Sequence, residues 1–322
     1  MRRGSLTVLG GLAITSVACS PQAPTAPADP PVEWRRELEA GMAAHREGRS
    51  ADAVAAFRAA TDAAAAMGSD DPRRAVALNN LAIVYIDDGR YEDAREPVTA
   101  AITILRLHQS TAPMIAVFLA QALTNAGSLN LNTGDPDAAE RDYREAVSLV
   151  ERLPDADART LAQGLTGLAD ALRQQGKLEE AAAYYRRGLP VAEHAYVPPS
   201  AALGRILNNY GQVLLLEGRF TEAIPLLERA VATSSAALGE DVLPVGIACD
   251  NLAQAQMQTG DHAGAERSFR RALAILERTV PPDHPELQAC LNNYAVFLRL
   301  NNRPAEAKRL ERRLTSEPPD ST

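Results

Sequence analysis

Apolar positions recur along most of this chain at the spacing of an α-helix. From about residue 33 to residue 315, hydrophobic side chains return every three or four positions, in stretches broken by short turns. One turn residue returns at successive spacings of 41, 45, 42, 42, 42 and 42 residues. This turn column contains Gly48, Gly89, Gly134, Gly176, Gly218, Gly260 and Asn302. Glycine or asparagine allows the left-handed backbone that a tight reversal requires, so the pattern predicts a helix pair around each of these residues.

Three further columns keep a fixed distance from this turn. Five residues after it stands an alanine column: Ala53, Ala94, Ala139, Ala181, Ala223, Ala265 and Ala307. Four residues later comes a large column: Phe57, Val98, Tyr143, Tyr185, Leu227, Phe269 and, in the last repeat, Glu311. The helix before the turn carries a small column: Gly41, Ala82, Gly127, Ala169, Gly211, Ala253 and Ala295. Small residues let the two helices of a pair approach closely, and the large side chain fills the remaining space.

This combination resembles the tetratricopeptide repeat over about residues 33–315. The usual repeat has about 34 residues, and the longer form is similar to the repeats of kinesin light chains and their bacterial relatives. That likeness is carried by the segments Leu78-Asn79-Asn80-Leu81-Ala82-Ile83-Val84-Tyr85 and Asp283-His284-Pro285-Glu286. The resemblance implies an all-α, right-handed superhelical solenoid of about seven helix-turn-helix repeats. Glu311 departs from the large column, as expected where no further repeat packs on the last helix.

The same resemblance implies a scaffold whose concave groove binds a peptide or protein partner. The first helix of each pair lines that groove, and the position three residues before the small column should point into it, together with the position one turn later. From the third repeat to the sixth, both rows consist of short polar groups, and a side-chain amide can pair with the N–H and C=O of an extended backbone. The predicted groove residues are Asn79, Thr124, Ser128, Thr166, Asp170, Asn208, Gln212, Asp250, Gln254 and Asn292.

A neighbouring column of asparagines has two interpretations. It contains Asn80, Asn125, Asn209, Asn251 and Asn293. In kinesin-light-chain-like repeats such asparagines contact the ligand backbone; alternatively, they bond to the adjacent repeat and fix the stacking. For this column we favour stacking, and for the column of Asn79 we favour ligand contact. The inward columns hold no lysine, which argues against the carboxylate clamp of tetratricopeptide proteins that bind chaperone tails.

The N-terminus differs in composition from the repeats. Arg2 and Arg3 precede an apolar run from Leu6 to Val17, which has 12 residues, whereas roughly 20 are needed to span a bilayer. The run therefore indicates an export signal. It ends at Ser16-Val17-Ala18-Cys19, which resembles the lipobox of bacterial lipoproteins. The resemblance implies a signal peptide over residues 1–18, acylation of Cys19 and a lipidated, disordered tether over residues 19–32. Residues 316–322 are predicted to form a disordered tail.

These features predict a lipid-anchored protein of the cell envelope. Ser20 follows Cys19 where an aspartate would favour the inner membrane, so we expect anchoring at the outer membrane, facing the periplasm. Two alternatives stay open. In one, Cys19 is not acylated and the protein is a soluble periplasmic or secreted binding module. In the other, the repeats form a structural array that associates with itself.

Composition and missing motifs narrow the functions further. The formal net charge is −8, and no basic face is visible, so we do not expect nucleic acid as a partner. The five histidines include no pair at metal-ligand spacing, and the sequence has no phosphate-binding glycine loop or serine elbow. We therefore expect no enzyme activity, no cofactor and no metal. Cys249 and Cys290 are expected to be buried small side chains, with a disulfide in an oxidising compartment as the alternative.

Overall fold

The computed structural model describes residues 32–153 and 157–314, and these residues form α-helices without any β-strand. The predicted all-α fold is confirmed. The helices are α1 Val32–Arg46, α2 Ser50–Ala65, α3 Pro72–Asp87, α4 Tyr91–His108, α5 Pro113–Asn132, α6 Pro136–Val150, α7 Ala158–Gln174, α8 Leu178–Ala195, α9 Ala201–Leu216, α10 Phe220–Leu238, α11 Leu243–Gln258, α12 His262–Thr279, α13 Pro285–Leu300 and α14 Pro304–Leu314. The expected signal peptide, the tether before residue 32 and the expected tail lie outside the described residues.

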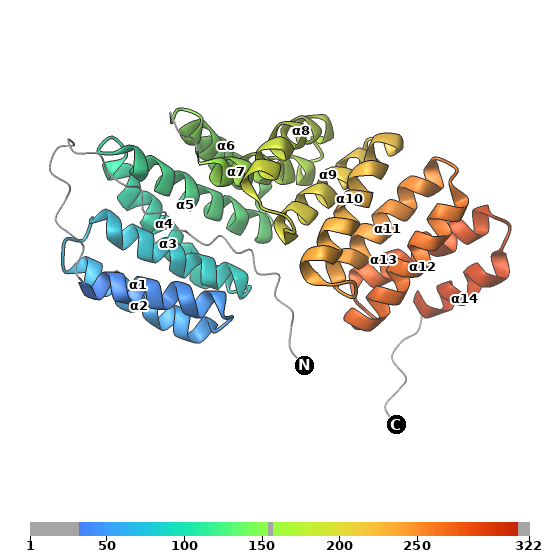
Figure 1. Ribbon diagram of the computed structural model, residues 1–322, viewed down its shortest axis with the longest axis horizontal. Coiled ribbons are helices and arrows are strands. Elements are labelled where there is room, and N and C mark those ends of the chain that lie inside the picture. Colours follow the sequence, from blue (N-terminus) through green and yellow to red (C-terminus); the bar gives the residue numbers. More distant parts are fainter. Residues whose placement is uncertain (1–31, 154–156, 315–322) are drawn as a thin grey trace, which may run out of the picture. The chain divides into compact units, whose positions relative to one another are not determined.

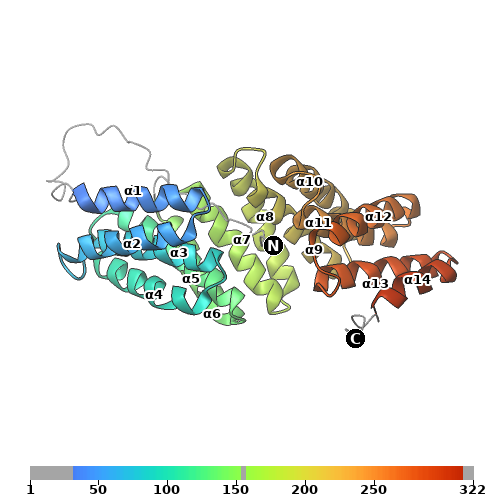
Figure 2. The same ribbon diagram turned by 90° about the horizontal axis from the view of Figure 1, so that it is seen from below.

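The chain divides into two compact units. The first comprises Met1–Ala171 and the second Leu172–Thr322, so that the boundary falls within α7. Within each unit, consecutive helices fold back on each other as hairpins. Figures 1 and 2 show the pairs α1 with α2 and α3 with α4 in the first unit, and α9 with α10 and α11 with α12 in the second. The first helix of one hairpin also contacts the first helix of the next, as α11 contacts both α9 and α13.

The turn column behaves as the sequence predicts. All seven residues adopt a left-handed backbone, with φ between +57° at Asn302 and +83° at Gly260. At the turn after α3, the N–H of Arg90 donates to the carbonyl of Tyr85 at 2.8 Å and the N–H of Gly89 donates to that of Ile86 at 3.0 Å. This is the pattern that satisfies the last carbonyls of a helix around a left-handed residue. Each hairpin therefore reverses within a few residues, which brings the packing columns together.

The packing columns are also confirmed. Every member of the alanine column is 0% exposed. In the second unit, a Cβ atom added at Gly211 would lie 2.6 Å from side-chain atoms of Leu227, the large residue of the same hairpin. In the first unit, a Cβ atom at Gly127 would lie 2.8 Å from the Tyr143 ring. The small and large columns are thus in close-packed contact, and a larger side chain in either column would displace the residue opposite it.

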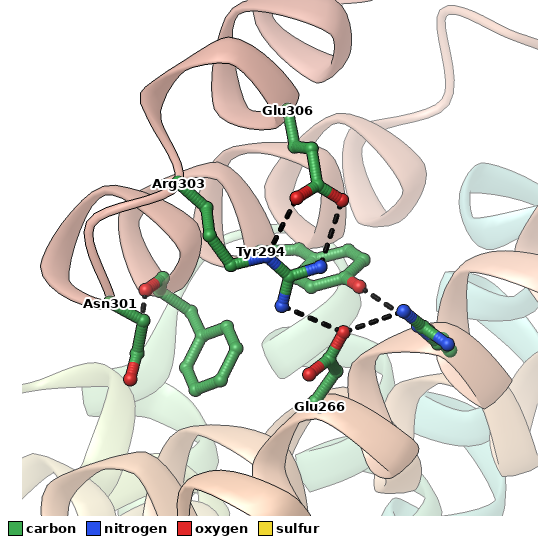
Figure 3. A network of polar contacts seen from close by, with 7 residues as sticks. Glu266, Tyr294, Asn301, Arg303 and Glu306 are labelled. Atoms are coloured by element: carbon green, nitrogen blue, oxygen red, sulfur yellow. Dashed lines mark hydrogen bonds and ion pairs between the residues drawn. The ribbon is translucent and has the colours of Figure 1, made fainter.

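Hydrogen-bonded ion pairs of arginine side chains connect the last hairpin to the one before it. Figure 3 shows Arg303, in the turn after α13, bonding to both carboxylate oxygens of Glu306 and to Glu266 of α12, the latter at 2.8 Å. Glu311, which replaces the large residue, pairs with Arg299 at 2.7 Å. The last helix therefore has a polar outer side, as expected for a terminal repeat.

The longest helix, α5, is also the most apolar. With 20 residues, it is the only described helix that has the length and hydropathy of a possible membrane span. Of the 18-residue stretch that meets this criterion, 44% is buried inside the protein. Leu119, Ala120, Ala122 and Leu123 are 0% exposed, and α5 packs against α4 and α6. A buried helix of a repeat fold has this same composition.

Candidate partner-binding surface

The predicted groove residues all lie on the first helices of the hairpins. The first unit holds Asn79 on α3, Thr124 and Ser128 on α5, and Thr166 and Asp170 on α7. The second unit holds Asn208 and Gln212 on α9, Asp250 and Gln254 on α11, and Asn292 on α13. Two residues four apart on one helix share a face. In each unit the structure therefore places the predicted residues in rows across neighbouring helices.

Several of these residues have little surface left for a ligand. Asn79, Thr124, Thr166, Asp170 and Asp250 are buried, each at most 8% exposed. The hydroxyl of Thr124 donates to the Gln121 carbonyl at 2.7 Å, and that of Thr166 donates to the Ala162 carbonyl at 2.8 Å. Each of these two hydroxyl groups therefore donates its proton to a backbone carbonyl of its own helix.

The remaining predicted residues retain accessible surface. Ser128, Asn208, Gln212 and Gln254 are half-buried, and Asn292 is exposed. These side chains are the part of the predicted site that a ligand can reach without moving the helices. Contact with a ligand stays a prediction for all ten residues.

Three of the neighbouring asparagines, Asn125, Asn251 and Asn293, bond to the preceding repeat, whereas Asn80 donates to the Val76 carbonyl of its own helix. We call each such hydrogen bond between successive first helices a rung. The Nδ2 of Asn125 on α5 donates to Oδ1 of Asn79 on α3 at 2.9 Å, which is the α3–α5 rung. The corresponding donor Asn251 on α11 bonds to Oδ1 of Asn208 on α9 at 3.0 Å, which is the α9–α11 rung. For these asparagines the structure shows the stacking interpretation, and it gives Asn79 and Asn208 a role as acceptors.

A third rung joins α11 and α13 and has a carboxylate as its acceptor. The Nδ2 of Asn293 donates to Oδ2 of Asp250 at 2.9 Å. The same oxygen accepts a second hydrogen bond, from Nε2 of Gln254 at 2.9 Å. Burial raises the pKa of Asp250, an effect that the hydrogen bond from Asn293 opposes and the nearby carboxylate of Glu286 increases.

Exposed apolar side chains continue the rows in the second unit. Leu216 lies four residues after Gln212 and is 58% exposed, and Leu300 on α13 is 69% exposed. Val296, between Asn292 and Leu300 on the same face, is 42% exposed. The sequence prediction omitted Leu216 and Leu300, although continuing the four-residue spacing by one step would have included them. Exposed apolar side chains beside polar rows suit a surface that contacts a partner.

A recess outside these rows was not predicted from the sequence. It has a volume of about 250 Å³ and is lined by residues of α4 and α5 together with Asp142 of α6. The Nδ2 of Asn130 donates to Asp142 at 2.8 Å. Burial raises the pKa of Asp142 to about 6, and the hydrogen bond from Asn130 opposes this shift.

The described part of the chain contains no group of three or more His, Cys, Asp or Glu residues arranged to hold a metal ion. Cys249 and Cys290 are buried and carry free thiols, which is the first of the two predicted arrangements. Absence of enzyme activity and of a cofactor stays a prediction.

Solved structures share the fold at low sequence identity. BtubC (BKLC) from P. vanneervenii is 20% identical, with a TM-score of 0.56, and the match covers 72% of this chain and 95% of that one. The kinesin-light-chain-like repeats of a Podospora anserina protein are 18% identical, with a TM-score of 0.52 and coverage of 60% and 92%. A Rap protein complexed with competence and sporulation factor is 15% identical, with a TM-score of 0.55 and coverage of 89% and 74%. These likenesses show the fold alone.

The sequence itself matches one family model in four overlapping or adjacent stretches. No curated protein matches the sequence. The model of the tetratricopeptide repeat matches residues 37–106, 118–194, 202–278 and 247–316, which together span most of the helices described above. The kinesin-light-chain-like neighbours agree with the long form of the repeat that the sequence indicates. The chain belongs to the tetratricopeptide repeat family.

Proposed function

We propose that this protein is a scaffold that binds a peptide or protein partner through the first-helix rows, and that it does so as a lipid-anchored protein of the cell envelope. The observation that supports binding is the set of accessible amides in the second unit. Gln212, Gln254 and Asn292 lie in one row system on α9, α11 and α13 and keep exposed surface. Their side chains can donate to and accept from a peptide backbone.

Family and chemistry support this proposal in different ways. Tetratricopeptide arrays serve as interaction scaffolds, and a Rap protein of the same fold is complexed with another factor. The rows in the second unit contain one acid, Asp250, and no lysine. Recognition there would depend on hydrogen bonds and on the apolar side chains Leu216, Val296 and Leu300 more than on charge. We therefore expect a partner segment of low net charge that carries apolar side chains.

Crosslinking in the native cells tests the binding surface. The surface variant is Gln212→Ala, Leu216→Ala and Asn292→Ala together. Gln254 is left unchanged because its Nε2 donates to the buried carboxylate of Asp250. Asn208 and Asp250 are left unchanged because they accept the rungs, so their loss would disturb the stacking as well as any ligand contact. Crosslinked partners of the full-length protein are captured and identified by mass spectrometry. We expect a partner that the wild type captures and the surface variant loses.

A matched variant controls for general effects of three substitutions. Glu228→Ala, Arg267→Ala and Lys308→Ala change exposed residues on the second helices α10, α12 and α14 of the same unit. This variant should retain the partner. If the surface variant and the control capture the same partners as the wild type, binding through the first-helix rows is refuted.

Fractionation of the cell envelope tests the anchor. Wild-type protein is expected in the outer-membrane fraction, because acylation of Cys19 adds several acyl chains that hold a protein at a bilayer. The Cys19→Ser variant should move to the soluble periplasmic or secreted fraction. Wild-type protein found in a soluble fraction would favour the alternative of a binding module without lipid, and would leave the proposed binding surface untouched.

A further inference from the structure

The three rungs have the same geometry but not the same acceptor. Donor and acceptor atoms are separated by 2.9 Å in the α3–α5 rung, 3.0 Å in the α9–α11 rung and 2.9 Å in the α11–α13 rung. The acceptor is a neutral amide oxygen of Asn79 or Asn208 in the first two, and a carboxylate oxygen of Asp250 in the third. An amide therefore suffices to form a rung, and the acid adds a titratable group to one junction.

The two amide donors of Asp250 bond to one oxygen of its carboxyl group. Both amides, from Asn293 and Gln254, bond to Oδ2. The other oxygen, Oδ1, is buried and has no hydrogen-bond partner, and the whole residue is 8% exposed. A buried ionised oxygen without a partner is unfavourable, because water no longer solvates its charge. A proton on this carboxyl group would remove the charge and leave Oδ2 able to accept both amides.

The groups that act most strongly on the pKa of Asp250 include no cation. On α12, which packs against α11, the charges of Arg271 and Glu277 act on the neighbouring Cys249 and Cys290. On α13 the carboxylate of Glu286 opposes ionisation, and the thiol of Cys290 interacts with the carboxyl group. On α11 itself, Cys249 precedes Asp250 and is also buried. The helix α9, on the other side of α11, contributes the exposed Arg205 and the phenol of Tyr210 as its ionisable groups. Burial and the neighbouring acid together raise the pKa of Asp250, and the hydrogen bonds from Asn293, Cys290 and Gln254 oppose them.

We infer that the junction between α11 and α13 is proton-sensitive: protonation of Asp250 stabilises the packing of the last hairpin on the one before it, and ionisation weakens that packing. The direction follows from linkage. An acid whose pKa is higher in the folded state than in the unfolded state binds more protons when folded. Its stabilising contribution is complete below the ordinary aspartate pKa of about 3.9 and is lost as the pH rises through the folded-state value. The inference does not depend on the proposed partner-binding function.

The test compares Asp250→Asn with its parent protein across pH. Asparagine keeps an oxygen that accepts from Asn293 and Gln254 and carries no charge at any pH. The Asp142→Asn background is used for both proteins, because the raised pKa of Asp142, about 6, would add its own pH dependence to the comparison. We expect Asp250→Asn to raise the melting temperature by about 2 °C or more near pH 8. This advantage should shrink towards zero near pH 4.5. Stability gained equally at all pH values, or lost near pH 8, would overturn the inference.

A control and a direct measurement complete the test. Asp283→Asn makes the same chemical change at an exposed position in the turn before α13 and should show no pH-dependent advantage. In the protein that retains Asp250, carbon-13 NMR follows its carboxyl group, which should titrate above the ordinary aspartate range. Titration within the ordinary range refutes the inference even if the variant fails to fold. Amide hydrogen exchange in α13, corrected for its intrinsic pH dependence, should slow relative to α9 as the pH falls.

Discussion

The α3–α5 junction of the first unit and the α11–α13 junction of the second are built alike and differ in one functional group. Both place an asparagine donor 2.9 Å from an acceptor on the preceding first helix. The acceptor in the first unit, Asn79, is neutral, whereas Asp250 in the second is an acid whose pKa is raised by burial. The comparison teaches that the rung position fixes the stacking by geometry, while the acceptor decides how the junction responds to pH.

The packing between the two helices of a hairpin is of the same kind in both units. In each unit a glycine on the first helix lies against a large side chain of the second, Gly127 against Tyr143 and Gly211 against Leu227. The alanine column is fully buried in both units. We therefore expect substitutions in the packing columns to affect the two units alike, and substitutions in the rungs to affect them differently.

The largest expected difference between the junctions comes from removing the donors. Asn293→Ala leaves a buried carboxyl group with one of its two amide donors and should lower the free energy of unfolding by about 3 kcal/mol near neutral pH. Asn125→Ala leaves a neutral amide and should lower it by about 1 kcal/mol. Urea denaturation, with hydrogen exchange to assign the affected hairpins, measures both. Equal losses would show that the charge of Asp250 has no energetic consequence at its junction.

Overpacking should give equal effects in the two units. Gly127→Ala and Gly211→Ala each introduce a methyl group where a side chain of the opposite helix already lies, within 2.8 Å and 2.6 Å of the added Cβ. Each should destabilise its unit by roughly 1–3 kcal/mol. Thermal denaturation checks this expectation. An unchanged melting curve for either variant would contradict the close approach of the two columns there.

The smallest expected effect concerns the acid in the recess of the first unit. The pKa of Asp142 is raised from 3.8 to about 6, so its stabilising contribution is complete at acid pH and is lost as the pH rises through about 6. Because Asp142 is only partly buried, solvent screening reduces the effect, and we expect Asp142→Asn to stabilise the protein by about 1 kcal/mol at pH 8. Near pH 4 the variant should match the wild type. A variant less stable than the wild type at pH 8 would contradict the assigned direction.

The fold was predictable because its determinants are local and repeat. A left-handed turn residue, a buried alanine and a small residue opposite a large one depend on positions within one hairpin. The first two recur at every hairpin at the same offset, and the large residue recurs at every hairpin except the last, where Glu311 stands. Agreement among seven copies separates these columns from chance in an alanine-rich chain. The division into two units was not predictable in this way, because the boundary within α7 interrupts none of the columns.

The candidate site was less predictable for a physical reason. The helical period tells which face Asn79, Thr124 and Thr166 share, but not whether a neighbouring helix covers that face. In the structure these side chains are buried, so their polar groups bond to the protein itself. Asp142 illustrates the same limit, since the other residues that line its recess belong to the preceding helices α4 and α5. Burial of a polar residue depends on such non-local contacts.

The two buried thiols make the junction between α11 and α13 observable without any added probe. Cys249 and Cys290 are 2% and 0% exposed, and burial raises the pKa of Cys249 to about 11. A thiol reagent attacks the thiolate and needs direct access to the sulfur. Labelling of these cysteines, in a Cys19→Ser background, therefore reports how often the last hairpins open. The rate at which these two cysteines react therefore measures the opening motions of the C-terminal hairpins.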